Sequence, residues 1–321
     1  IRDSVSAVAP EVTTGAGGVI LFGSAAPSNL GAQLTALRAL GSAIPPFSMT
    51  DEEGGAVQRM ANLVGSVPSA RQMAASLSAA QINTLAQTLG RRMAQAGVTM
   101  DLAPVLDLDA GNGPNNSDAD GTRSFSLDES IAASDGLAFA AGLRTGGVIP
   151  VVKHFPGLGN ASGNTDATPA TTLPWSELQQ HGLLPFSAAV AQGYPAVMVS
   201  NASVPGLTTL PASISSTLIT GVLRTQLGFH GLVLTDSLSA AALAQIGYSV
   251  PAATVAALAA GADMMLFSSD AAHVASTTAV IVQAIRAAVN NGSLQLSRLE
   301  DAVAHILATK GIDPCIVAPP A

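Results

Sequence analysis

The sequence predicts an α/β protein built on a (β/α)8 barrel. Short apolar runs rich in Val, Ile, Leu and Met alternate with longer Ala- and Leu-rich segments along the whole chain. This alternation is typical of a parallel sheet, and nearly continuous apolar runs indicate strands covered on both faces. The chain of 321 residues suits one large barrel, and no linker or composition break marks a second unit. We therefore expect residues 1–321 to form a single domain.

Seven segments are predicted to be strands because each is a short apolar run. In chain order they are Gly18–Gly23, Pro46–Thr50, Thr99–Leu106, Val148–His154, Ala196–Ser200, Gly231–Thr235 and Asp263–Phe267. A closed barrel needs eight strands, and the opening segment Ile1–Thr14 looks helical or irregular. We therefore expect the first strand of the barrel to lie ahead of Ile1. A seven-stranded open sheet is the alternative.

Helical patterns separate the predicted strands, because apolar residues recur there at helical spacing over longer stretches. The clearest are Ala70–Ala96, Ser126–Thr145, Trp175–Gln192, Ser213–Leu227, Ala275–Asn290 and Ser297–Thr309. The most apolar stretch, from about Val250 to Phe267, is interrupted by Asp263. It therefore predicts a buried helix followed by a buried strand, and no bilayer span. The Pro-rich tail Gly311–Ala321 is expected to wrap the surface.

Polar side chains follow the predicted strands where each one ends, at the edge where parallel α/β folds place their active sites. Four of these ends carry a carboxylate, and one carries an adjacent lysine and histidine. Such a cleft suits an uncharged, polyhydroxylated ligand, because carboxylates accept hydroxyl protons and cations donate to oxygens. The residues concerned are Asp51, Glu52, Glu53, Asp107, Asp109, Lys153, His154, Asn201, Asp236 and Ser268–Asp270.

The sequence KHFPGLG at 153–159 is the most informative of these ends. Lys153 and His154 would rarely follow a fully apolar strand unless they pointed into a cleft. The alternative is that one side chain reaches solvent and the other caps a loop carbonyl. The Gly- and Asn-rich segment 157–172 that follows is long enough to close over a site.

Two other candidates are each open to two interpretations. Asp236 follows the strand core LVLT and precedes an Ala/Leu-rich helix, so it either faces the cleft or caps the helix. Asp51, in MTDEEGGAVQRM, has the same ambiguity. Arg59 either reaches the same pocket or pairs with Glu52 or Glu53 on the surface.

Four motifs in the same order resemble glycoside hydrolase family 3: DEEGGAVQRM, GTRSFS, VVKHFPGLGNASGNTD and GLVLTDSLS. The similarity runs from about Gly17 to Gly311. The closest branch is the single-domain β-N-acetylhexosaminidase type that releases GlcNAc from cell-wall fragments. The resemblance implies a (β/α)8 barrel, no metal or other cofactor, and a double-displacement mechanism that retains the anomeric configuration.

The same resemblance implies a role for each matching residue. Asp236 falls at the position of the family's nucleophile. The residues implied for sugar binding are Asp51, Arg59, Arg123, Lys153 and His154.

The sequence departs from the branch at two positions. The branch carries its acid/base on a D-[ST]-H triplet, which here aligns with Asn164-Thr165-Asp166. Asp166 is our candidate for the group that protonates the leaving oxygen and later deprotonates water. In a retaining pair it should close to ~5–5.5 Å from Asp236, and the alternative is that it only bonds its own loop. Asn201 stands where the branch commonly has histidine, which implies a changed hold on the leaving group.

We therefore expect an exo-acting retaining β-glycosidase that hydrolyses terminal GlcNAc from cell-wall glycan fragments. The first alternative is a β-glucosidase of the same family. The second, motivated by the altered triplet, is a catalytically impaired barrel that binds glycans without turning them over. An unrelated barrel enzyme for phosphorylated metabolites is disfavoured, because SSDAAH follows the last strand where a Gly-rich phosphate loop would be expected.

Charge and composition constrain the partners and the location. The formal net charge of −8 and the pI of about 4.9 argue against nucleic acid as a ligand. We expect a monomer that binds an oligosaccharide or glycoside. No signal peptide is visible, but the chain begins at Ile1 without a methionine, so export to the cell envelope is favoured over a cytoplasmic location. Cys315 has no second cysteine in the chain, so it is either a free thiol or paired outside it.

Overall fold

A computed structural model describes residues 5–40 and 44–313 of the chain. The expectations for Cys315 and for most of the Pro-rich tail lie outside the described residues. The short helices η1 (Val5–Val8) and α1 (Ala9–Thr13) form the described part of the opening segment, as its pattern predicted.

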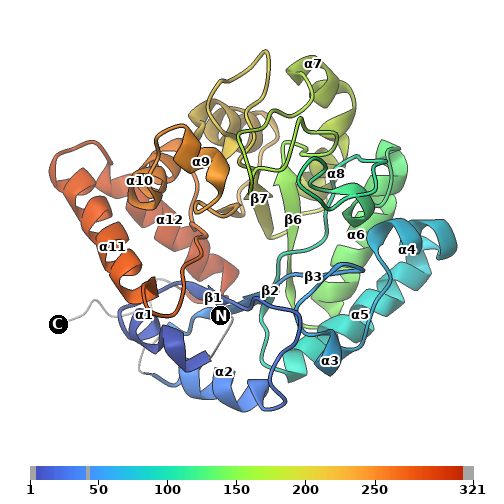
Figure 1. The fold of residues 1–321 in the computed structure, drawn as a ribbon, viewed down its shortest axis with the longest axis horizontal. Helices are drawn as coiled ribbons and strands as arrows, with labels where there is room; N and C mark the ends of the chain where they lie inside the picture. The colour runs from blue at the N-terminus through green and yellow to red at the C-terminus, as the bar shows by residue number, and fades with distance from the viewer. Residues whose placement is uncertain (1–4, 41–43, 314–321) are drawn as a thin grey trace.

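A parallel sheet of six strands forms the centre of the fold (Figure 1). Each strand is hydrogen-bonded to the next one along the chain, without reversal of order. The sheet is curled into a half-barrel, which confirms the α/β class with parallel strands. The strands are β1 (Gly18–Ile20), β2 (Phe47–Thr50), β5 (Met100–Asp101), β6 (Ile149–Phe155), β7 (Ala196–Val199) and β8 (Leu232–Thr235).

Three predicted strands are much shorter than their apolar runs suggest, and the first of them, Gly18–Gly23, is a strand only at β1. The run Thr99–Leu106 pairs as a strand only at β5, and Val105 adds an isolated bridge to Lys153. Pro104 interrupts this run because proline has no N–H to donate to a ladder. The run Asp263–Phe267 forms only one bridge, from Met264 to Leu234 of β8.

A cavity of about 410 Å³ lies between β1 and the segment 263–267. Its apolar lining comes from both edges and includes Val19 and Phe22 on one side and Met264 and Phe267 on the other. Among the described residues no strand pairing joins these two edges. The half-barrel therefore has a seam where its first and last strand segments face each other.

Helices surround the sheet, with α4, α5 and α6 on one side of β6 in Figure 1 and α10, α11 and α12 on the opposite side. In chain order after α1 the helical segments are α2 (Leu30–Arg38), α3 (Ala61–Val64), α4 (Ala70–Ser76), α5 (Ala79–Gln95), η2 (Gly121–Arg123), α6 (Glu129–Thr145), α7 (Trp175–Glu177), η3 (Leu178–Gly182), α8 (Leu184–Ala191), η4 (Ala212–Ile214), η5 (Thr217–Gln226), α9 (Ala241–Gln245), α10 (Val250–Ala260), α11 (Val274–Asn290) and α12 (Leu296–Thr309). None of the described helices is both long and apolar enough to cross a membrane.

Three of the predicted helices are broken into shorter pieces. The prediction of one helix over Ala70–Ala96 was wrong, because Ser78 begins a new helix there. Its side chain accepts from the backbone N–H of Gln81, and the Gln81 side chain accepts in return from the Ser78 N–H. The segments 175–192 and 213–227 each contain a π-helical stretch, η3 and η5 respectively.

The core has two layers, because alternate residues of each strand point to opposite faces of the sheet. One apolar cluster takes residues from every strand, such as Met49 of β2 and Met198 of β7. Neighbouring residues such as Val19 and Val197 belong instead to clusters shared with the surrounding helices. Both faces of the sheet are thus buried, as the continuous apolar runs predicted.

Candidate active site

Charged side chains gather where the strands end, as their positions in the sequence predicted. Asp51 directly follows β2, and Lys153 and His154 lie near the end of β6. A two-stranded antiparallel hairpin, β3 (Glu52–Gly54) and β4 (Val57–Gln58), follows Asp51. Asp236 directly follows β8.

A buried ion network connects three of these chain segments. The Lys153 Nζ lies 2.9 Å from Asp51 Oδ1 and 2.5 Å from Glu53 Oε1. Arg123 donates from Nε and Nη2 to the two oxygens of Glu53, at 2.8 and 2.9 Å. The network holds two carboxylates and two cations, so its formal charge is balanced.

The network fixes the charge of its members. Burial alone would lower the pKa of Lys153, but Asp51 and Glu53 outweigh it and raise the pKa above the usual value. Burial would likewise raise the pKa of Glu53, but Arg123 and Lys153 hold it well below its usual range. Lys153 is therefore an ammonium and Glu53 a carboxylate at neutral pH.

Arg59 faces the pocket and does not pair with Glu52 or Glu53 on the surface. Its Nη2 lies 3.7 Å from Asp51 Oδ2, and its guanidinium lies over the ring of Phe22. Glu52 is fully buried and accepts backbone N–H groups, including that of Arg59, so the alternative of a surface pair with this carboxylate does not hold. Glu53 is also buried, in the ion network.

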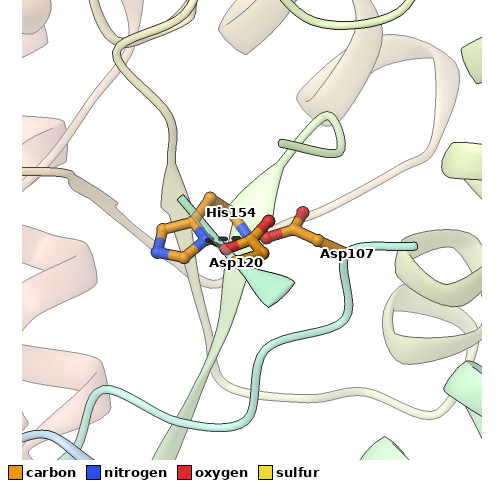
Figure 2. A group of neighbouring side chains, drawn as sticks. All are labelled: Asp107, Asp120 and His154. Atoms are coloured by element: carbon orange, nitrogen blue, oxygen red, sulfur yellow. Dashed lines mark hydrogen bonds and ion pairs between the residues drawn. The ribbon is translucent and has the colours of Figure 1, made fainter. Parts of the chain in front are cut away.

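His154 lies against two buried aspartates (Figure 2). Its Nδ1 lies 2.7 Å from Asp107 Oδ2 and 3.8 Å from Asp120 Oδ1. Asp107 also accepts the backbone N–H groups of His154 and Leu158. Because Asp107 serves as an acceptor to backbone donors, we assign the Nδ1 proton to the imidazole. The Nε2, on the opposite side of the ring, is then an acceptor and lies 3.4 Å from Arg123 Nη2.

Burial sets the protonation of this cluster. It raises the pKa of Asp107 to about 7. Burial, together with the charge on Asp107, also raises the pKa of Asp120 well above its usual value. Burial and the positive charge of Arg123 lower the pKa of His154 to about 4, so the imidazole is neutral at neutral pH.

The same cluster offers three metal-ligand atoms within 4.8 Å of one another, from Asp107, Asp120 and His154. The guanidinium of Arg123 lies 3.4 Å from Asp120 Oδ1, however, and would repel a cation held there. The arrangement instead suits a neutral histidine held in one orientation.

Asp236 does not cap a helix. The next helix, α9, begins at Ala241 with Ala240 at its N-cap position. The Asp236 Oδ1 accepts the backbone N–H of Ser237 at 2.7 Å. Burial raises the pKa of Asp236, and the neighbouring His154 and Lys153 oppose that rise. Asp236 therefore belongs electrostatically to the cluster around Lys153 and His154.

Asp166 lies on the loop between β6 and α7. Its side chain is exposed, its backbone N–H donates to Asn164 Oδ1 at 3.0 Å, and its carbonyl accepts from Ala241. Its charge adds to the rise in the pKa of Asp236, so the two carboxyl groups interact electrostatically.

Other candidates from the sequence have local roles. Asp109 accepts backbone N–H groups of Gly111 and Asn160, which ties two loops together. The segment 268–270 lines the seam cavity. The Asn201 side chain is bonded to Ser213 and to the backbone of Ser237.

The proposed set of site residues omitted three buried carboxylates. In the sequence Glu53 and Asp107 are polar residues after predicted strands, a pattern that does not distinguish a site residue from a loop residue. Asp120 follows no strand, so its position gave no signal. The neighbouring motif at Arg123 was the one available indication that this loop reaches the site.

The chain is similar to known proteins over most of its length. Residues 10–309 match the family described as Glycosyl hydrolase family 3 N terminal domain. Beta-hexosaminidase LpqI of Mycobacterium tuberculosis is 35% identical over 98% of this chain and 80% of the relative. An uncharacterized secreted glycosyl hydrolase of Arthroderma benhamiae is 35% identical over 91% of this chain and 84% of the relative.

Solved structures show the same similarity. The structure of M. tuberculosis LpqI superposes with a TM-score of 0.88 at 33% identity, covering 98% of this chain and 92% of that one. A glycoside hydrolase family 3 β-N-acetylglucosaminidase from Paenibacillus superposes with a TM-score of 0.88 at 29% identity, covering 99% of this chain and 61% of that one.

The parallel α/β sheet and the charged side chains at the carboxyl ends of its strands, together with these similarities, define a glycoside hydrolase. The chain belongs to glycoside hydrolase family 3.

Proposed function

We propose that the chain is a retaining β-N-acetylglucosaminidase that releases terminal GlcNAc from a glycan. The observation that carries this proposal is the position of Asp236, which follows β8, caps no helix and shares its electrostatic environment with Lys153 and His154. The family and the names of the relatives support the choice of sugar. In this mechanism Asp236 attacks the anomeric carbon and forms a glycosyl-enzyme.

The ion network supplies the sugar-binding groups. Asp51 presents carboxylate oxygens, and Lys153 and Arg123 present N–H donors that Glu53 holds in place. The His154 Nε2 can accept a sugar hydroxyl proton because Asp107 occupies Nδ1. Arg59 adds a second cation beside Asp51. A site whose cations are each paired with a carboxylate favours an uncharged, polyhydroxylated substrate.

Asp166 is the proposed acid/base. It must protonate the leaving oxygen in the first step and deprotonate water in the second. Its exposed position and its interaction with Asp236 support the proposal, because closure of the loop would bring the carboxyl over the cleft and exclude water. A separation of ~5–5.5 Å between the two carboxyl groups is expected in the closed state.

Labelling with a 2-fluoro sugar tests the nucleophile. A 2-fluoro-β-glycoside with an activated leaving group should inactivate the enzyme and add one sugar to Asp236, found by peptide mass spectrometry. Turnover of an aryl glycoside without any label on Asp236 would overturn the assignment.

The alternative of a glycan-binding barrel instead predicts bound sugar and no product from any aryl glycoside. A panel of p-nitrophenyl glycosides separates GlcNAc from glucose as substrate.

The acid/base role of Asp166 makes a separate prediction. Asp166→Asn should slow substrates with poor leaving groups by 10²- to 10⁴-fold, the usual contribution of general acid–base catalysis. Activated aryl glycosides need less protonation and should lose much less in the first step. Measuring kcat/KM across a series of leaving groups tests this, and an equal loss for all of them would contradict it.

We also propose that the half-barrel is part of a single-domain (β/α)8 barrel, with an eighth strand in the seam cavity. Apolar side chains line both edges of the cavity, and the adjoining segments run parallel to their neighbours. Glu11, buried beside it, has no hydrogen-bond partner for either carboxylate oxygen among the described residues. An added strand would cover the apolar lining and could donate to this carboxylate.

We further propose an exported monomer that acts on cell-wall fragments. The secreted relative from Arthroderma benhamiae supports export. Size-exclusion chromatography with light scattering tests the monomer. Release of GlcNAc from purified cell-wall fragments tests the natural substrate.

A further inference from the structure

The Asn201 side chain is hydrogen-bonded to the segment that carries Asp236. It follows β7 by two residues, and only 1% of its surface is exposed. Its Nδ2 donates to the backbone carbonyl of Ser237 at 2.8 Å. Its Oδ1 accepts the hydroxyl proton of Ser213 at 2.6 Å, and Ser213 is also fully buried.

Backbone hydrogen bonds around Asp236 and Ser237 hold this segment in place. The backbone N–H of Asp236 donates to the carbonyl of Val199 at 2.9 Å. The N–H of Ser237 donates to Asp236 Oδ1 at 2.7 Å. The carbonyl of Ser237 accepts from Asn201 and, at 3.0 Å, from the backbone of Ala240. The direction of the Ser237 N–H, and therefore of the Asp236 carboxylate, depends on these anchors.

A primary amide suits this position because it is a donor on one side and an acceptor on the other, without charge. Ser213 fixes which side is which, since its hydroxyl donates to Oδ1 and leaves Nδ2 for the Ser237 carbonyl. Replacing Asn201 by aspartate would set a carboxyl oxygen against that carbonyl and add charge beside Asp236. Replacing it by alanine would leave the Ser213 hydroxyl without its partner.

We propose that Asn201 is a positioning residue for Asp236, and that Ser213 orients its amide. The pair holds the Ser237 backbone so that its N–H binds one oxygen of the Asp236 carboxylate and leaves the other directed into the cleft. This inference rests on the proposed role of Asp236 as the nucleophile. Small displacements of a reacting group are costly, because a misplacement of about 1 Å can cost on the order of 10²-fold in rate.

Inactivation kinetics with the 2-fluoro glycoside test the proposal, because they separate binding from attack by Asp236. In Asn201→Ala we expect the limiting inactivation rate constant to fall about 10- to 100-fold, with little change in the concentration that gives half-maximal rate. Ser213→Ala should show a smaller fall in the same constant. Intact mass should still reach one sugar per chain in both variants, which shows that the folded fraction is unchanged.

A matched control separates positioning from loss of stability. Asn83 donates from its side chain to the carbonyl of Ala138, between α5 and α6 and away from the site. Asn83→Ala should lower the melting temperature and leave the inactivation rate constant unchanged. A rate constant in Asn201→Ala equal to that of the wild type, or a loss confined to the labelled fraction, would overturn the inference and leave the role of Asp236 intact. Failure of the wild type to label at Asp236 would overturn both.

Discussion

Single carboxyl groups show most clearly how burial changes chemistry in this protein. Asp120 is almost fully buried, and its Oδ2 has no hydrogen-bond partner among the described residues. Its Oδ1 has only long contacts, 3.4 Å from Arg123 Nη1 and 3.8 Å from His154 Nδ1. A carboxylate with so few donors is costly to bury, so the neutral acid is favoured.

The first prediction at this scale concerns the pH dependence of stability. Asp120 and Asp107 both ionise near pH ~4 when unfolded. In the folded protein burial raises the pKa of Asp107 to about 7 and that of Asp120 well above its usual value. Their contribution to stability is therefore complete below pH ~4 and is lost as the pH rises through the folded values. Asp120→Asn keeps the neutral shape, so its melting temperature should fall less steeply than that of the wild type between about pH 5 and pH 8.

An exposed aspartate provides the control. Asp128 caps α6 by accepting the N–H groups of Ser130 and Ile131, and these hydrogen bonds lower its pKa. Its contribution is present above its unfolded pKa of ~4 and is lost only as the pH falls. Asp128→Asn should therefore shift the melting curve almost equally at every pH in the same range. Parallel curves for the wild type and Asp120→Asn would contradict the neutral state of Asp120.

The sequence allowed the ends of strands to be identified at residue level, but not the contacts of their side chains. The structure brings Lys153 and His154 together with Arg123 and Asp51, as their positions suggested. Asp120 could not have been predicted, because its interaction with His154 depends on how the loop 108–120 folds back toward β6. No periodic pattern encodes such a loop.

Among the secondary-structure elements, helices α5 and α6 pack closely against each other. The contact is made through glycines, because an added Cβ at Gly90 would lie 3.0 Å from the carbonyl oxygen of Leu143. A Cβ at Gly142 would lie 2.4 Å from the carbonyl oxygen of Asn83. The backbones of the two helices therefore approach closely where these residues meet.

Because of this contact, replacing a glycine by alanine here should destabilise the protein, although alanine has the higher helix propensity. Alanine normally stabilises a helix by up to ~1 kcal/mol relative to glycine. Gly142→Ala should instead destabilise the protein by about 1–3 kcal/mol, because the methyl group forces the two helices apart. Gly221→Ala in η5 is the matched control, since the nearest atom to its added Cβ is 3.8 Å away. Urea denaturation measures both, and a neutral Gly142→Ala would show that the helices can separate without cost.

The existence and the order of the helices and strands could be predicted from apolar periodicity, whereas their boundaries could not. The break between α4 and α5 depends on Ser78, which looks like any polar residue within an amphipathic pattern. The shortening of the third predicted strand depends on Pro104. The seventh run has strand composition, but among the described residues it pairs with β8 alone. Pairing on a second side is a property of the whole sheet and cannot be inferred from one segment.

At the scale of the whole molecule, the seam determines where the half-barrel is expected to open first. The segment 263–267 directs its described backbone hydrogen bonds toward β8 and the loop after it. Its other edge faces the apolar cavity. The half-barrel should therefore open first along this line.

Hydrogen exchange measures that opening. In the chain of residues 1–321, amides of 263–267 should exchange faster than those of β8, which is paired on both sides. An exchange rate as slow as that of β8 would show that the seam edge is already paired in solution. Peptic fragments read by mass spectrometry resolve the two segments.

The ion network has a consequence for folding of the chain during its synthesis. Lys153 pairs with Asp51 across 102 positions of the chain, and Arg123 pairs with Glu53 across 70. Asp236 comes still later in the sequence. A nascent polypeptide emerging from the ribosome could therefore bury Glu53 against its cations only after residue 153 had left the exit tunnel. Until then the carboxylates of Asp51 and Glu53, which are buried in the folded protein, must stay hydrated. This requirement delays collapse of the first half of the sheet.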